Sequence, residues 1–200
     1  MPSSALHVAR TGLEAQDTRM RVIAHNLANI GTSGYKRERA NFATLAYQDM
    51  RVAGQQSSNE TSYATGINLG TGVSVQSTTN VLSQGTLNPT GNSFDIALDG
   101  DGYFQVQLPG GQLGYTRAGN FSLSAEGQLV TAQGYPVQPQ ITIPEGATTI
   151  TVGNDGSVSA TLAGSGQANV IGELTVAKFI NPGALQAIGD NFLRETAASG

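Results

Sequence analysis

The carboxylates at 98–104 have the spacing in this chain that best suits cation binding. In LDGDGYF, Asp99 and Asp101 stand two residues apart, like the first ligands of a calcium loop. Such a loop also needs a bidentate acid at its twelfth position, where this chain has Gly110. The glycines instead favour a tight turn between strands, as in GNDGS at 153–157. We therefore expect neither a metal site nor a cofactor.

The remaining reactive side chains do not form a recognisable catalytic set. His7 and His25 lie about five turns apart on a predicted helix, and the chain has no cysteine. No G-x-S-x-G elbow is present. The GTG at 70–72 and the GDG at 100–102 lack the further glycine and the strand–helix context of a nucleotide loop. The sequence thus predicts neither an enzyme nor a small-molecule substrate.

Composition and charge exclude several other classes of protein. Only 12% of the 200 residues are charged, against about 25% in typical soluble domains, and 26 are glycine, which favours short strands and many turns. Residues 1–51 carry seven basic and four acidic side chains, whereas residues 52–200 carry three and ten, so head-to-tail contacts between copies are electrostatically favourable. The sequence has no dense Lys/Arg face of the kind that binds nucleic acids, so it does not predict nucleic-acid binding. No apolar run predicts a membrane span, and the polar N-terminus is unlike a cleaved signal peptide.

Residues 4–30 are predicted to form one helix with an apolar stripe in heptad spacing. We call this stripe the seam; its residues are Leu6, Ala9, Leu13, Gln16, Met20, Ile23, Leu27 and Ile30. On the opposite side we place the charged residues Arg10, Glu14, Asp17, Arg19 and Arg21. A helix packed on its own β domain would show a broader stripe, so we expect a partner helix from another copy, another protein or a segment outside this sequence.

The rest of the chain is predicted to be mainly β. A short helix is possible around Phe42, Leu45, Ala46 and Met50, and the polar residues 54–72 predict a long loop or extended arm. From residue 73 the apolar period changes to two, with turn signals between short strands and a hairpin around 154–156. The expected fold class is antiparallel β with a coiled-coil-type N-terminal helix. We divide it into residues 1–35, a connector at 36–74 and a β domain at 75–200.

Three motifs resemble the rod and hook family of bacterial flagellar axial proteins. TGLEAQDTRMRVIAHNLANIGTSGYKR resembles the N-terminal signature of that family, with His25 where an Asn is usual. The segment from Asp99 to Pro139 resembles the β domain of the family, and NPGALQAIGDNFLRETAASG resembles the return toward its C-terminal segment. The resemblance implies a structural subunit of a helical tube that transmits torque around an export channel. It also implies a second, C-terminal helix, so the chain looks C-terminally truncated at Gly200.

The resemblance also implies roles for particular residues. The side chains of the seam would be buried between neighbouring helices. The helix exit, where the chain leaves the helix, would be shaped by Asn26, Asn29, Thr32, Gly34 and Tyr35. An inter-subunit arm would use Gln55, Gln56, Asn59, Tyr63, Ile67 and Leu69. The implied partners are copies of the chain, adjacent rod and hook subunits and the surrounding ring proteins. The implied location is the basal body in the periplasm and cell envelope, reached by flagellar type III export without a cleaved signal.

Two alternatives stay open. The arm most resembles an insertion of the distal rod member of the family, but a proximal rod or hook subunit is the nearest alternative. A different class is a glycan- or peptidoglycan-binding β module, for which Tyr103, Phe104, Tyr115 and Phe121 could supply an exposed aromatic platform. Their alternation with polar residues favours a role in the core instead.

Overall fold

A computed structural model describes residues 2–164 and 167–200. Its two compact units are Met1–Ile30 with Lys36–Val81, here unit 1, and Gly31–Tyr35 with Leu82–Gly200, here unit 2. The described part is mainly antiparallel β with one long N-terminal helix, so the expected fold class is confirmed. The predicted division of the chain into residues 1–35, 36–74 and 75–200 describes roles in an assembly and stays a prediction.

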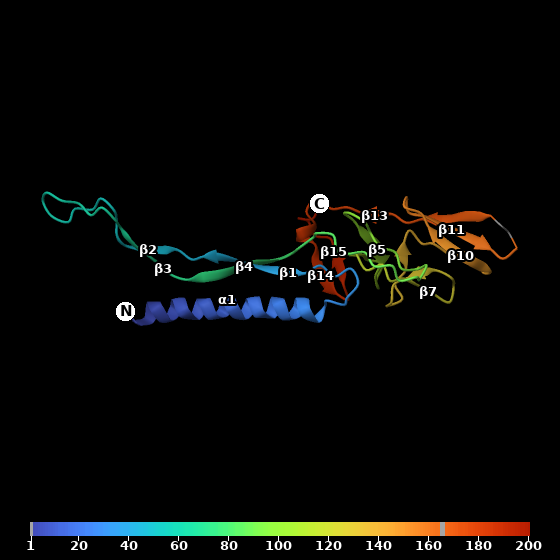
Figure 1. The fold of residues 1–200 in the computed structure, drawn as a ribbon, viewed down its shortest axis with the longest axis horizontal. Coiled ribbons are helices and arrows are strands. Elements are labelled where there is room, and N and C mark those ends of the chain that lie inside the picture. The colour runs from blue at the N-terminus through green and yellow to red at the C-terminus, as the bar shows by residue number, and fades with distance from the viewer. Residues whose placement is uncertain (1, 165–166) are drawn as a thin grey trace. The chain divides into compact units, whose positions relative to one another are not determined.

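Unit 1 consists of a helix lying on a long antiparallel ladder (Figure 1). The helix is α1, Pro2–Ala28, and the strands are β1, Glu38–Thr44, β2, Tyr47–Arg51, β3, Ile67–Gly70, and β4, Val73–Asn80. β1 pairs with β4 from Glu38↔Asn80 to Thr44↔Val73, with one register shift at Asn41/Phe42. β2 pairs with β3 beyond it. The α1 helix packs against β1 and β4, and the tip of the β2–β3 hairpin extends past its N-terminal end (Figure 1).

The short helix expected around Phe42–Met50 is wrong, because these residues form β1 and β2. Their near-helical apolar spacing arises from two irregularities of the ladder, the register shift after Asn41 and the break at Leu45–Ala46. Across the ladder the Asn41 amide donates to the hydroxyls of Ser77 and Thr79, both at 3.1 Å. Tertiary pairing therefore overrides a weak local pattern.

The polar segment 54–72 is also more regular than expected. Its C-terminal part forms β3 and closes a hairpin with β2, with an isolated bridge between Gln56 and Ser62 nearer the tip. The paired ribbon starts at Tyr47, before the segment that composition singled out, and the role of this segment as an arm stays a prediction.

Unit 2 is built from short strands in several small sheets. They are β5, Tyr103–Gln107, β6, Leu113–Thr116, β7, Ser122–Leu123, β8, Leu129–Val130, β9, Val137–Gln138, β10, Ala147–Val152, β11, Ser157–Leu162, β12, Ala168–Glu173, β13, Val176–Ala177, β14, Gln186–Gly189, and β15, Phe192–Arg194. One sheet has the order β13-β5-β6-β15-β14 with β9 also on β5, another is β10-β11-β12, and β7 pairs with β8. The hairpin expected around 154–156 joins β10 to β11 and is confirmed.

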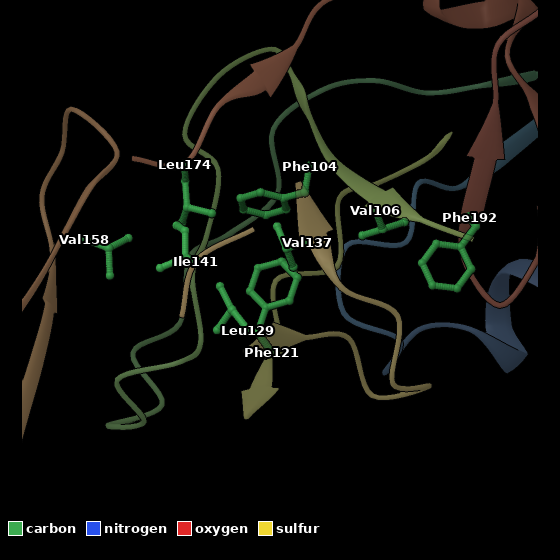
Figure 2. Packing of buried hydrophobic residues seen from close by; sticks show 9 residues of the cluster. All are labelled: Phe104, Val106, Phe121, Leu129, Val137, Ile141, Val158, Leu174 and Phe192. Atoms are coloured by element: carbon green, nitrogen blue, oxygen red, sulfur yellow. The ribbon is translucent and has the colours of Figure 1, made fainter. Parts of the chain in front are cut away.

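Unit 2 holds the hydrophobic core (Figure 2). The buried cluster comprises Phe104, Val106, Phe121, Leu129, Val137, Ile141, Val158, Leu174 and Phe192. The rings of Phe104 and Phe121 meet edge to face with centroids 5.0 Å apart. In contrast, Ala15 is the one fully buried apolar residue among the described part of unit 1. Unit 1 therefore gains little from burial within one copy.

Candidate assembly surface

The seam, which runs along α1 and ends at Ile30 in the turn just after it, lies open to solvent in the single chain. Its six large side chains are 55–82% exposed: Leu6, Leu13, Met20, Ile23, Leu27 and Ile30. Ala9 and Gln16 are exposed as well. A contiguous apolar stripe of this kind on a protein surface marks a site of interaction with other protein.

A different face of α1 lies on the β1–β4 ladder. Its residues are buried or half-buried at a spacing of 3.6: Thr11, Ala15, Thr18, Val22, Asn26 and Asn29. At about 100° per residue, this face is centred roughly 145° around the helix from the seam. The helix thus packs on strands of its own chain, which the sequence analysis argued against, but it does so without using its apolar stripe.

The charged side chains do not lie opposite the seam, as the sequence analysis placed them. Arg10, Glu14, Asp17 and Arg21 occupy one flank between the seam and the packed face, and Arg19 lies on the other flank. The first four form two exposed ion pairs, Arg10–Glu14 and Arg21–Asp17, each at 2.8 Å. In each pair the two residues lie one helical turn apart. The reason is that small and uncharged polar residues are needed where the helix touches the backbone of the ladder.

Polar bonds near both ends hold the packed face of α1. The side-chain amide of Asn26 donates to the Glu38 carbonyl at 2.8 Å and its oxygen accepts from the Glu38 N–H at 2.8 Å. Near the other end, the Thr11 hydroxyl accepts from the Val73 N–H at 3.3 Å and donates to the Val8 carbonyl at 2.8 Å. Gly72, at φ 126°, lies against this hydroxyl with no room for a Cβ.

The predicted helix-exit residues divide between the two units. Asn26 and Asn29 belong to unit 1, where the Asn29 amide donates to the His25 carbonyl at 2.9 Å. Thr32, Gly34 and Tyr35 belong to unit 2, in a turn where the Tyr35 N–H donates to the Thr32 carbonyl at 3.2 Å. Their common role at the helix exit remains a prediction.

The turn at 31–35 is built into unit 2. The Asn191 side chain donates to the Ser33 carbonyl at 2.8 Å, and Gly34, at φ 70°, lies directly on the backbone of Arg117 and Ala118. The turn also lines a hollow of about 290 Å³, together with residues that include Asn120, Thr131 and Phe192. Only glycine fits at position 34, because a Cβ would overlap backbone atoms that cannot move aside.

Gly34→Ala is therefore expected to lower the free energy of unfolding of unit 2 by about 1–3 kcal/mol, measured by urea unfolding with amide exchange at Asn191. Gly31→Ala is the matched control, since a Cβ at Gly31 meets nothing within 4 Å. Equal stability of the two variants would contradict the packing described for Gly34.

The arm, which we now define as residues 47–70, presents both apolar flanks and a polar tip. Its exposed large side chains are Tyr47, Met50, Val52, Tyr63, Ile67 and Leu69. The guanidinium of Arg51 lies over the Tyr63 ring at 4.1 Å, and the hydroxyls of Ser57 and Ser58 contact that of Thr61 at 2.8 and 2.7 Å. The sequence-based prediction left Tyr47, Met50 and Val52 out of the arm, because it began the arm at residue 54 and considered a short helix before it.

The aromatic platform of the glycan-binding alternative is not formed by the four side chains considered for it. Tyr103, Phe104, Tyr115 and Phe121 are 1–5% exposed. Tyr103 and Tyr115 each meet Phe179 edge to face. The pKa of Tyr115 is raised, mainly by burial and to a smaller extent by the hydrogen bond to Glu195. These rings are core and cannot bind a sugar face.

Within residues 2–164 and 167–200 no group of three or more potential metal ligands lies together. No helix of that described part has the length and apolar character of a membrane span.

Comparison with known proteins identifies the family of this chain. A family model described as "Flagella basal body rod protein" matches residues 6–36, and one described as "Flagellar hook protein FlgE/F/G D1 domain" matches residues 97–160. The chain is 48% identical over 196 residues to the flagellar basal-body rod protein FlgG of Buchnera aphidicola subsp. Schizaphis graminum, covering 98% of this chain and 75% of the relative. The chain belongs to the flagellar basal-body rod protein family.

Other relatives refine this placement. The rod protein FlgG of Caulobacter vibrioides is 46% identical over 197 residues, again with 98% and 75% coverage. The hook protein FlgE of Helicobacter mustelae is 36% identical over 129 residues, covering 64% of this chain and 28% of the hook protein. The rod-family match at 6–36 spans the seam and the turn after it. The chain is thus a structural subunit of the bacterial flagellar basal-body rod.

Proposed function

We propose that the seam is the surface through which this rod subunit assembles, by packing against helices of other copies and of adjacent rod or hook subunits. The observation that supports the proposal is the exposure of six large apolar side chains on one side of α1 while the other side is already packed. Burying all six would contribute about 9–18 kcal/mol. Heptad spacing suits knobs-into-holes packing against another helix.

Repetition of such a contact yields a tube. A heterologous interface that does not close generates a helical assembly, here one that transmits motor torque and encloses an export channel. In it, residues 1–35 form the axial layer, 36–74 the connector with its arm and 75–200 the outer β domain. The turn from Asn26 to Tyr35 sets the direction in which the chain leaves the axial helix.

The arm extends the assembly sideways in this proposal. Its flanks offer apolar contacts and its tip offers amide and hydroxyl groups; the predicted contacts are Gln55, Gln56, Asn59, Tyr63, Ile67 and Leu69. A paired ribbon at its base, stiffened by the Arg51–Tyr63 contact, supports a rigid bridge between subunits. The outer β domain would face the surrounding ring proteins in the periplasm, after type III export.

We place the subunit in the distal section of the rod and assign it no catalytic activity. The support is the identity of 43–48% over nearly the whole chain to several rod proteins named FlgG, against 36% over a shorter span for the hook protein. A proximal rod or hook subunit is the second candidate, because the match at 97–160 covers hook and rod proteins together. A hook must let its subunits slide, so rigid contacts of the arm with neighbouring copies would favour the rod.

Site-specific photo-crosslinking in flagellated cells tests the proposal. A crosslinking side chain at Leu13 on the seam should give adducts with other copies or adjacent axial subunits in isolated basal bodies. The matched position is Arg21, on the charged flank of the same helix, where we expect fewer such adducts. Crosslinking at Asn59 reports on the arm. Absence of adducts from Leu13 in assembled basal bodies would refute the seam as the assembly surface.

A further inference from the structure

The face of α1 that packs on the β1–β4 ladder is not its apolar face. The helix carries an apolar stripe, yet the face laid on the ladder has one fully buried side chain, the small Ala15. Burial of apolar surface alone would favour the opposite arrangement, with the seam turned onto the strands. Something other than apolar packing selects the face that is observed.

The polar bonds at the two ends of this contact supply that selection. Asn26 pairs with the Glu38 backbone through two bonds of 2.8 Å, one as donor and one as acceptor, much as a neighbouring strand would. Fifteen residues earlier, the Thr11 hydroxyl accepts from the Val73 N–H. Two attachment points about 22 Å apart on one side of a helix, at 1.5 Å per residue, fix its rotation about its own axis.

The strands are shaped to receive these two groups. The Thr11 hydroxyl sits against Gly72, at a φ of 126° that side-chain-bearing residues avoid and with no room for a Cβ. Glu38 is the first residue of β1, paired with Asn80, and its N–H and carbonyl both bond to the Asn26 amide. If the helix rotated, these backbone groups would lose their partners in a part-buried position, which is unfavourable.

We propose that Asn26 and the Thr11–Gly72 contact form a rotational clamp. The clamp, rather than apolar packing, decides which face of α1 lies on the ladder, and it thereby keeps the seam outside in the unassembled subunit. This inference concerns a single copy and stands independently of the assembly proposed above. Asn26 and Thr11 are accordingly positioning residues, which act through the orientation of the helix.

Cysteine accessibility in the dilute monomer tests the clamp. The chain has no native cysteine, so Leu13→Cys reports on the seam and Ala15→Cys on the packed face, where Ala15 is 6% exposed against 72% for Leu13. With the clamp intact, we expect the thiol at 13 to be alkylated at least about tenfold faster than the thiol at 15. The clamp is removed by the near-isosteric pair Asn26→Leu and Thr11→Val.

In the clamp-free protein we expect the protection of position 15 to fall by about tenfold. Slower labelling at 13 shows that the helix has rolled its seam onto the strands; unchanged labelling at 13 shows that the helix has left them. Both outcomes support the clamp. Protection at 15 that stays within about twofold of the parent overturns it, because apolar packing alone would then hold the face.

Two control variants separate the clamp from a general loss of hydroxyl groups. Thr18→Val removes a hydroxyl from the same face of α1, but that hydroxyl donates to the Glu14 carbonyl within the helix at 3.0 Å. It should leave both labelling rates unchanged. Thr11→Ser, with Asn26 native, keeps the hydroxyl and should leave position 15 as protected as in the parent. Loss of protection in Thr18→Val as large as in the clamp-free protein would also overturn the proposal.

Discussion

Cells whose only copy of this rod subunit carries Leu13→Lys are expected to be non-motile and to lack completed rods. The ammonium would have to enter the apolar contact between helices without a partner, at a net loss of about 3 kcal/mol or more per interface, or about 100-fold in affinity. Because a helical assembly repeats each interface in every subunit, a loss of this size prevents growth. Motility assays and electron microscopy of isolated basal bodies measure the result.

The same substitution should leave the isolated chain folded, because Leu13 is 72% exposed in a single copy. We expect its unfolding free energy to change by no more than about 0.5 kcal/mol. His7→Lys adds the same side chain at an exposed position outside the seam and should support motility. Leu13→Met retains an apolar side chain and should do so too. Motile Leu13→Lys cells with normal rods would rule out the seam as an assembly surface.

Phe104→Ala should be the most destabilising single truncation in unit 2. The side chain is 1% exposed, lies in the middle of the core shown in Figure 2 and meets Phe121 edge to face. Removing it leaves a cavity, which short strands held in place by their hydrogen-bonded neighbours cannot close. We expect the free energy of unfolding to fall by about 3–5 kcal/mol. Urea unfolding followed by tyrosine fluorescence measures this loss, since the chain has no tryptophan.

Leu113→Ala provides the comparison for that measurement. Leu113 is 43% exposed on β6, the neighbour of the β5 strand that carries Phe104. Its truncation should cost about 1 kcal/mol or less. If the two substitutions cost the same, Phe104 does not occupy the centre of a packed core.

Periodicity predicted the elements whose pattern is long and regular. The helix was expected at 4–30 and lies at Pro2–Ala28, whereas the strands begin with β1 at Glu38 and not near residue 73. Heptad spacing also identified the seam residues as exposed, since six of them lie open to solvent. The hairpin at 154–156 was predictable because its turn residues carry their own conformational preference.

The failures lie where contacts distant in sequence decide the structure. The strands β1 and β2 were misread as a helix because a register shift and a two-residue break disturb their alternation. The face of α1 that packs on the ladder was missed because small and polar residues give no hydrophobic signal. Its spacing at 11, 15, 18, 22, 26 and 29 was nevertheless present in the sequence as a second stripe.

The turn from Gly31 to Tyr35 has a consequence for how this subunit can be cut. Both of its neighbours in sequence belong to unit 1, yet the turn itself belongs to unit 2, so the polypeptide passes between the units three times, after residues 30, 35 and 81. A single protease nick at any one of these crossings leaves two covalent links intact. A fragment of residues 82–200 would lack Ser33 and Gly34. It would therefore lose the hydrogen bond from Asn191 to Ser33 and the packing of Gly34 against the backbone of Arg117.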